Sequence, residues 1–260
     1  MRQDDRQTRA QEAEYAFPYH YLPVLKERKF SSTRHWDWGF RYFGGMELAI
    51  DLLRDEPFAS LIDIGCGDGR FLREIANRFS GPRLLGVDVS ARAVRLAQAL
   101  NPDLEYRSLD IVRDAVAERF AVATLIEVIE HIPPAELPAF LHAVIETLAE
   151  GGKLVLTVPH RNKPQIEKHY QHFTGSELRA LLAPYLDDIR LFPFDPAARS
   201  APLMWLIERV LGAKGKWFLF TNTRVLYLLY RLYIRRYLYA SDESCCERIA
   251  LVGRKKPVGR

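Results

Sequence analysis

Short apolar runs alternate along the chain with longer segments in which apolar residues recur at helical spacing. The runs are typical of buried strands, because they are rich in branched and aromatic residues and end at turn-forming residues. The predicted strands are residues 60–64, 83–87, 104–109, 120–126, 153–158, 188–194 and 248–253.

The segments between these runs are predicted to be amphipathic helices. Their apolar residues recur alternately three and one positions apart, which places them on one side of a helix. Ser90 is a natural N-cap, and Thr174 with Glu177 forms a capping-box sequence. The predicted helices are residues 69–79, 90–100, 135–149 and 174–182. Strands that alternate with helices predict an α/β fold with a parallel sheet.

Two aromatic-rich segments flank this alternating core. The first, residues 1–57, begins with a polar lead of 14 residues, but residues 15–56 are too apolar for a free tail, and the segment is expected to form an N-terminal cover. The second, residues 195–244, combines aromatic residues with mostly basic charges, and we expect two helices around residues 212–215. The core itself is assigned to residues 58–194, and the last strand with a basic tail to residues 245–260.

Composition restricts the functions open to this chain. Of its 260 residues, 48% are hydrophobic and 27% are charged, which suits a globular protein with a sizeable core. A net charge of +4 is modest, so nucleic acid is not the expected partner. Three cysteines, two of them adjacent, indicate free thiols, and no apolar run reaches the roughly 20 residues of a membrane span. A cytoplasmic location is expected, with peripheral contact to a membrane as an addition.

A glycine-rich turn follows the first strand of the core. Its sequence, DIGCGDG, runs from Asp63 to Gly69 and leads directly into a helix. Glycine allows positive φ and lets the backbone approach a ligand closely. Asp88 ends the next strand, where a carboxylate can accept both ribose hydroxyls of a nucleoside ligand. The frame G-x-G-x-G differs from the G-x-G-x-x-G of nicotinamide dehydrogenases, which makes an oxidoreductase the weaker interpretation.

The order of these motifs resembles that of the class I S-adenosylmethionine-dependent methyltransferases. LIDIGCGDGRF is similar to the first motif of that family, GVDVS to the second, SLDI to the third and AVATLIEVIEHI to the fourth. GGKLVLTVP is similar to the strand after the fourth motif, so the resemblance covers residues 58–194. It extends to the groups that include quinone-biosynthesis O-methyltransferases. The resemblance implies a Rossmann-like, seven-stranded, mostly parallel sheet with helices on both faces and an antiparallel last strand.

The resemblance also implies how S-adenosylmethionine is bound. The glycine loop would cradle its methionine part, with Asp63 near the amino group and Asp88 on the ribose. Val89 would flank the adenine, and Asp110 would accept from the adenine amino group, unless it serves as a helix N-cap. The full set of implied cofactor residues is Asp63, Gly65, Cys66, Gly67, Gly69, Asp88, Val89, Asp110, Ile111 and Glu127.

Acidic and imidazole side chains follow the fourth strand, where acceptors of this family lie. His131, assisted by Glu130, is a candidate base that removes a proton from an acceptor hydroxyl. Alternatively, Mg²⁺ or another divalent metal would bind there, because E-x-x-E-H followed by a later histidine resembles small-RNA 3′-terminal 2′-O-methyltransferases and some quinone-biosynthesis O-methyltransferases. The candidate metal ligands are Glu127, Glu130, His131 and His172. His172 is preferred to His169 because it abuts a helix start, and a purely structural role of the segment stays open.

The reaction that these features favour is methyl transfer to oxygen of a small-molecule, lipid-linked or glycan acceptor. Two alternatives stay open: a non-catalytic cofactor-binding scaffold that holds a partner through its insert, and a metal-dependent 2′-O-methyltransferase acting on RNA. Residues 200–240 are expected to act as a lid, a homodimer face or a contact with an anionic membrane surface, because arginines lie among their aromatic residues.

Overall fold

The computed structural model describes residues 24–26, 29–31, 36–114, 116–197, 202, 206, 223–239 and 242–257. Three predicted features lie outside these residues: the aromatic positions before Val24, the expected helix break at 212–215, and the end of the basic tail from residue 258.

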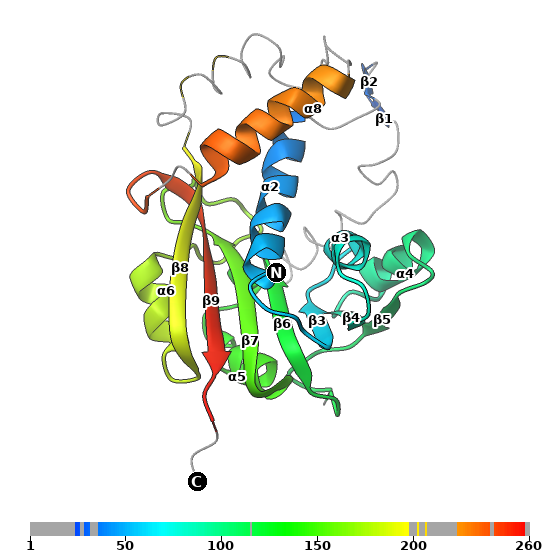
Figure 1. Cartoon of the computed structure of the whole chain (residues 1–260), viewed down its shortest axis with the longest axis vertical. Coiled ribbons are helices and arrows are strands. Elements are labelled where there is room, and N and C mark those ends of the chain that lie inside the picture. The colour runs from blue at the N-terminus through cyan, green and yellow to red at the C-terminus, as the bar shows by residue number, and fades with distance from the viewer. Residues whose placement is uncertain are drawn as a thin grey trace.

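A seven-stranded sheet forms the centre of the molecule, in the order β5-β4-β3-β6-β7-β9-β8 (Figure 1). β9 is antiparallel to both of its neighbours, whereas the pairs on the other side of the sheet are parallel. This is the Rossmann-like arrangement that the resemblance predicted. The strands are β3 (Ser60–Ile64), β4 (Arg83–Asp88), β5 (Glu105–Ser108), β6 (Phe120–Ile126), β7 (Leu148–Pro159), β8 (Leu186–Pro196) and β9 (Cys246–Lys255).

Helices cover both faces of the sheet, so its strands are apolar on both sides. One hydrophobic cluster joins the sheet to α2, α3 and α4, and the other joins it to α5 and α6. Adjacent residues of one strand therefore enter different clusters, as Leu61 and Ile62 do. The helices are α2 (Trp36–Leu53), α3 (Arg70–Arg78), α4 (Ala91–Leu100), α5 (Leu137–Glu146) and α6 (Gly175–Leu182).

The predicted helix starts are confirmed in atomic detail. The Ser90 hydroxyl accepts from the Ala93 N–H over 3.2 Å. At α6, the Glu177 N–H donates to the Thr174 hydroxyl over 3.3 Å, and the Thr174 N–H donates to the Glu177 carboxylate over 2.9 Å. These bonds satisfy N–H groups that the first helical turn leaves without a partner.

The boundary between α5 and β7 differs from the prediction. The helix expected to reach residue 149 ends at Glu146, and β7 begins at Leu148 rather than at residue 153. The cause is pairing across the sheet, because Leu148 already lies opposite Phe120 of β6. The glycine pair after residue 150 therefore lies inside the strand, where Gly151 adopts a φ of 67°.

The described part of the insert is helical, as predicted. α8 (Thr223–Leu232) continues into a π-helix, η3 (Tyr233–Leu238). Figure 1 shows α8 crossing above α2, at the end of the sheet opposite to the one where β9 finishes. The Tyr230 ring lies 5.5 Å from the Phe40 ring and 6.5 Å from the Phe43 ring. A separate two-stranded antiparallel pair consists of β1 (Val24–Lys26) and β2 (Lys29–Ser31). In the view of Figure 1 it appears beside the N-terminal end of α8.

A buried ionic cluster fastens α2 and η3 to the sheet. The Asp195 carboxylate lies 3.0 Å from Arg41 of α2 and 3.1 Å from Arg248 of β9. It also accepts from the Tyr233 hydroxyl over 2.9 Å. Burial alone would raise the pKa of Asp195, but the two guanidinium groups lower it below its ordinary value. Residues distant in sequence are thus joined beside the carboxyl end of β7.

Candidate active site

The glycine loop after β3 has the backbone shape that only glycine adopts easily. Gly65, Gly67 and Gly69 have φ angles of 76°, 54° and 76°. The N–H groups of Gly65 and Cys66 both donate to the Val87 carbonyl, over 2.8 and 3.0 Å. The loop is therefore anchored on the end of β4, at the carboxyl edge of the sheet where open α/β sheets bind ligands.

Two of these glycines also lie too close to other side chains to carry one of their own. A Cβ on Gly65 would lie 2.6 Å from Val128, and a Cβ on Gly69 would lie 2.5 Å from the Tyr106 hydroxyl. Tyr106 is buried and donates to the Gly69 carbonyl over 3.3 Å. The loop is thus shaped by its neighbours before any ligand binds.

Asp88 connects the loop to the start of α4. One carboxylate oxygen accepts from the Gly67 N–H over 2.9 Å, and the other accepts from the Ser90 N–H over 2.8 Å. A carboxylate offers about four lone-pair directions, so these bonds leave capacity for ligand hydroxyls. The structure therefore fixes the orientation of the carboxylate that was predicted to bind ribose.

Asp63 is buried beneath the loop, with its side chain 2% exposed. It accepts from the Thr124 hydroxyl of β6 over 2.7 Å. Burial raises the pKa of Asp63 to about 7, although the bond from Thr124 opposes the rise. Thr124 was not predicted from the sequence, because a threonine inside an apolar strand carries no signal of its own.

The predicted adenine side lies after β4 and β5. Val89 is exposed, and Ile111 is partly buried. The Asp110 carboxylate accepts from the Val112 N–H over 3.0 Å and pairs with Arg113 at 3.3 Å. Asp110 thus caps a turn at residues 111–114, and no helix begins at these described residues, so the helix N-cap that the sequence left open is not what the structure has.

Two carboxyl groups follow β6. Glu127 has a left-handed φ of 56°, and its buried Oε1 has no hydrogen-bond partner among the described residues. Glu130, in the short helix η1 (Ile129–His131), is fully buried, and neither carboxyl oxygen has such a partner. Burial, and then the nearby Glu127, raise the pKa of Glu130 well above its ordinary value.

His131 lies in η1, and His169 and His172 lie beside it. Hydrogen-bond partners determine the tautomer of each of these three histidines. Nδ1 of His131 lies 3.0 Å from the Lys168 carbonyl oxygen. Nδ1 of His172 lies 3.0 Å from the Lys163 carbonyl oxygen. Because a carbonyl only accepts, both Nδ1 atoms carry the proton, and Nε2 of each neutral ring has a lone pair. Nε2 of His172 then accepts from Nδ1 of His169 over 2.8 Å, which gives Nε2 of His169 a lone pair as well.

The residues that converge differ from the predicted metal ligands. Within the described chain, one ligand atom each from Glu130, His131 and His169 lies within 4.8 Å of the others, and neither Glu127 nor His172 belongs to this group. His172 contacts the group through its bond to His169. The cause is a backbone bond, because the Tyr170 N–H donates to the Glu130 carbonyl over 2.8 Å and places the preceding residue against η1.

The imidazoles of His169 and His172 are both neutral in this environment. Burial, followed by the nearby His131 and His172, lowers the pKa of His169 to about 2. Burial also lowers the pKa of His172. Uncharged imidazoles with an outward N–H bonded to a carbonyl or another imidazole have the form of metal ligands and of bases.

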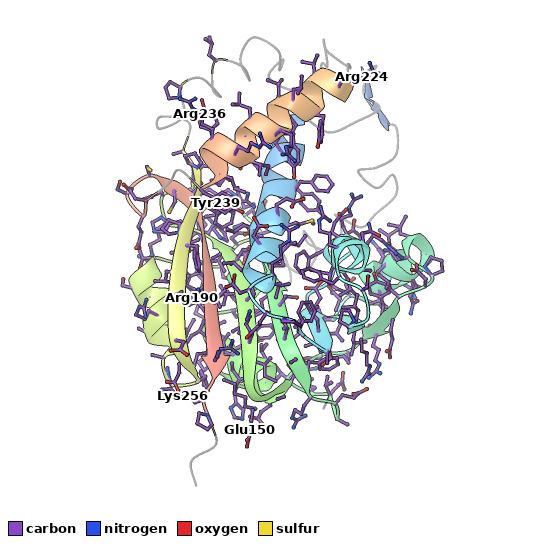
Figure 2. All side chains as sticks on the ribbon, in the orientation of Figure 1. Glu150, Arg190, Arg224, Arg236, Tyr239 and Lys256 are labelled. Carbon is purple, nitrogen blue, oxygen red and sulfur yellow. The ribbon has the colours of Figure 1, made fainter. Side chains whose placement is uncertain are left out.

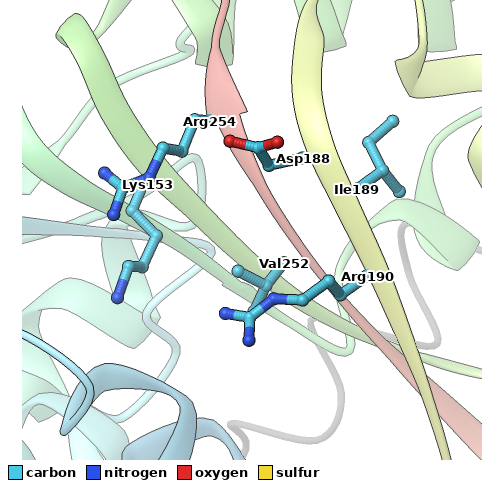
Figure 3. A pocket seen from close by; sticks show the side chains of 6 residues that line it. All are labelled: Lys153, Asp188, Ile189, Arg190, Val252 and Arg254. Atoms are coloured by element: carbon cyan, nitrogen blue, oxygen red, sulfur yellow. The ribbon is translucent and has the colours of Figure 1, made fainter.

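A cavity of about 400 Å³ opens elsewhere, between β7, β8 and β9 (Figure 3). Its lining residues are Lys153, Asp188, Ile189, Arg190, Val252 and Arg254. Lys153 pairs with Arg254 in the sheet, far along β7 from its carboxyl end at Pro159. Both cations contact Glu56, at 3.1 and 2.6 Å. This cavity is therefore separate from the glycine loop and from η1.

Comparison with known proteins gives the family. A family model described as a methyltransferase domain matches residues 40–193, more than half of the chain. The chain belongs to the methyltransferase-domain family. The N-methyltransferase NodS from Bradyrhizobium japonicum WM9, solved with S-adenosyl-L-homocysteine, has a similar structure. The TM-score is 0.57 with 15% sequence identity, and the match covers 97% of this chain and 99% of NodS. That likeness shows a shared fold.

Curated relatives of this methyltransferase-domain protein match a smaller share of the chain. Ubiquinone biosynthesis O-methyltransferase of Idiomarina loihiensis is 29% identical over 108 residues, which are 39% of this chain and 43% of that protein. Trans-aconitate 2-methyltransferase of Deinococcus radiodurans is 30% identical over 109 residues, 42% of this chain and 41% of that protein. The chain thus spans less than half the length of these two relatives.

Proposed function

We propose that the protein transfers a methyl group from S-adenosylmethionine to an oxygen atom of a small-molecule, lipid-linked or glycan acceptor. The observation that carries this proposal is the glycine loop fixed by Asp88 at the carboxyl edge of the sheet, one strand away from the cluster of Glu130, His131 and His169. A loop suited to a nucleoside and a group suited to accept a proton would thus follow adjacent strands, β3 and β6. The family match and the relatives that methylate oxygen support the same activity.

The loop residues suit the cofactor's charges. Backbone of Gly65, Cys66, Gly67 and Gly69 would approach the methionine carboxylate closely, since the three glycines carry no side chain and that of Cys66 is buried. Asp63 in its ionised form would attract the methionine ammonium group. Asp88 would complete its set of hydrogen bonds with the ribose hydroxyls.

His131 would serve as the proton acceptor for an attacking hydroxyl. The sulfonium already carries a good leaving group, so the protein has to align the acceptor and remove its proton. The bond from Nδ1 to the Lys168 carbonyl orients the ring and places the basic lone pair on Nε2, on the side where Glu130 lies 3.9 Å away. This arrangement favours oxygen over an amine acceptor, which needs less help with its proton.

An assay with ¹³C-methyl-labelled S-adenosylmethionine tests this function. The acceptor panel contains a catechol, a polyprenyl-substituted phenol and a polyprenyl-phosphate-linked sugar, and the methyl carbon shift identifies the acceptor atom. We expect O-methyl product, and about a hundredfold lower kcat in His131→Gln with unchanged S-adenosylhomocysteine affinity. His142→Gln, at an exposed histidine of α5, is the matched control. Label on nitrogen or carbon, or full activity of His131→Gln, would contradict the proposal.

As an alternative to proton transfer by His131, we propose that Glu130, His131 and His169 bind a divalent cation, because the single Nε2 lone pair of His131 cannot hold a cation and accept a proton at once. They present one carboxyl and two imidazole lone pairs to a common point, and the Glu130 oxygens have no hydrogen-bond partner within the described structure. The donor set suits the metals that accept imidazole and carboxylate together. When bound, such a cation lowers the pKa of a coordinated hydroxyl and orients it.

Calorimetric titration with Mg²⁺ and Mn²⁺, without cofactor or acceptor, tests the cation separately from the reaction. We expect binding by the wild type and at least tenfold weaker binding by His169→Gln, because a ligand is lost. His172→Gln should weaken binding less, since it removes only the partner of His169. Equal affinities of His169→Gln and the wild type would show that the cluster acts without metal.

A further inference from the structure

The outward face of α8 and η3 carries large side chains that are mostly exposed. Tyr227 and Leu228 are 58% and 66% exposed, and Arg231 and Arg235 are exposed beside them. The opposite face of α8 packs inward, where the Tyr230 ring lies 5.5 Å from the Phe40 ring. The helix therefore has two different faces. Its apolar face packs against α2, and its other face presents both apolar and cationic side chains to solvent.

The charge of this helix has a single sign. Residues 223–239 contain arginine at positions 224, 231, 235 and 236 and neither aspartate nor glutamate. Figure 2 shows Arg224 and Arg236 near the two ends of the helical segment, at the extremity of the molecule. Exposed aromatic and aliphatic side chains among arginines are the composition of helices that lie in the interface of an anionic membrane.

The position of α8 relates this surface to the candidate active site. β9 runs antiparallel to β7, so the carboxyl ends of the parallel strands lie at the end of the sheet where β9 starts. In Figure 1 this is the end covered by α8, and η3 contacts β8 there through Tyr233 and Asp195. A surface that meets α8 would thus also face the edge of the sheet that bears the glycine loop and η1.

We propose that the outward face of α8 and η3, formed by Tyr227, Leu228 and Arg231 of α8 and Arg235 of η3, binds the anionic phospholipid headgroups of a membrane surface. The arginines contact phosphate oxygens while Leu228 and Tyr227 enter the boundary between headgroups and acyl chains. Binding is peripheral, since none of the described helices is long and apolar enough to cross a bilayer. The inference does not depend on the proposed reaction, but it gives a lipid-linked acceptor a direct route to the site.

The same charges argue against a second copy of the chain as the occupant. A two-fold symmetric contact through this face would place the arginines of one copy against those of the other. No acidic side chain of residues 223–239 is present to compensate them. Anionic headgroups match both the charge and the exposed apolar side chains.

Co-sedimentation with vesicles tests the proposal on the full-length protein without cofactor. One set of vesicles contains phosphatidylcholine alone, and the other contains equal parts of phosphatidylcholine and phosphatidylglycerol. We expect binding to the anionic vesicles, with weaker binding at high salt because exposed charges are screened. Arg231→Gln/Arg235→Gln should bind about 25-fold less tightly, at about fivefold for each arginine. Leu228→Ser should bind about tenfold less tightly.

The control is Arg95→Gln/Arg179→Gln, which removes the same charge from exposed positions of α4 and α6. It should bind anionic vesicles like the wild type, and all variants should keep the wild-type melting temperature. Failure of the wild type to bind anionic vesicles, or equal binding by Arg231→Gln/Arg235→Gln, would overturn the proposal. Arginine-dependent binding of a single-stranded RNA, or arginine-dependent dimerisation, without vesicle binding would also overturn it. Calorimetry with S-adenosylmethionine on the same samples measures cofactor binding separately, so that a failure of the proposed reaction is distinguished from a failure of membrane binding.

Discussion

Two acidic side chains near the ends of β3 and β6, Asp63 and Glu130, are buried in the protein. Burial disfavours the charged form of a carboxyl group, so the pKa values of both are raised. Such groups cost folding free energy and are concentrated at functional sites. At the residue scale, the acids beside the glycine loop and η1 are therefore the strongest physical sign that this edge of the sheet binds a polar ligand.

Asp63 makes the stability of the protein depend on pH in a defined direction. Its pKa is about 7 in the folded state and 3.8 ordinarily, so the folded state retains a proton that the unfolded state releases. The contribution is fully present below the ordinary pKa and is lost as pH rises toward 7. Between about pH 5 and about pH 8, the wild type should lose about 2 to 3 kcal/mol of unfolding free energy relative to Asp63→Asn.

Urea denaturation of both proteins at the two pH values measures this difference. Asparagine can still accept from Thr124, so the substitution removes mainly the ionisation. Asp187→Asn, at an exposed carboxylate of β8, serves as the control and should follow the wild type at both pH values. A difference between wild type and Asp63→Asn that does not change with pH would show that Asp63 is not proton-linked to folding.

Gly69 should not tolerate alanine, whereas Gly81 should. Both have left-handed backbones, with φ of 76° and 97°, so both substitutions carry a strain of about 1 to 2 kcal/mol. At Gly69 the new Cβ also meets the packed Tyr106 ring, which adds about 1 to 3 kcal/mol. At Gly81 it meets no atom of the described protein within 4 Å. Thermal denaturation compares the two variants, and equal losses would contradict the close packing of the loop.

At the scale of elements, the ionic cluster is what joins the helical insert to the core. Arg41, Asp195, Tyr233 and Arg248 come from α2, the end of β8, η3 and the start of β9. Asp195 is 2% exposed, and Arg248 is also buried. A buried cation without its anion is costly, so Asp195 contributes to the attachment of α2 and η3 to the sheet, beside the Arg41–Glu247 pair and the shared hydrophobic cluster.

Asp195→Asn should therefore destabilise the protein by about 3 kcal/mol or more, because Arg248 stays buried without a counter-charge. Asp187→Asn, on the same strand but exposed, should change the unfolding free energy by less than about 0.5 kcal/mol. Urea denaturation of both variants gives the comparison. A small effect of Asp195→Asn would mean that solvent replaces the carboxylate and that the cluster does not fasten the insert.

The elements and the site differ in how far the sequence predicts them. Apolar periodicity and capping residues are local signals, so most strands, the Ser90 cap and the Thr174 capping box are found without the structure. The choice between His169 and His172 depends on the bond from Tyr170 to Glu130, which no periodicity reveals. The ionic cluster is similarly hidden, since Arg41 and Arg248 lie at opposite ends of the chain.

At the scale of the whole molecule, the chemistry is concentrated at one end. The glycine loop, η1 and the ionic cluster all lie at the carboxyl ends of parallel strands, and α8 crosses that end (Figure 1). The cavity between β7, β8 and β9 lies elsewhere and is lined by paired charges. The candidate site and the described part of the helical insert therefore lie at the same end of the sheet.

Calorimetric titration with S-adenosylmethionine, with EDTA and then with Mg²⁺, measures directly whether the glycine loop and Asp88 bind this cofactor. We expect saturable binding that does not need metal, and at least tenfold weaker binding by Asp88→Ala, since that carboxylate shapes the loop and would bind the ribose. Exposed Asp187→Asn should bind like the wild type. Absence of cofactor binding by the folded wild-type protein would contradict the account.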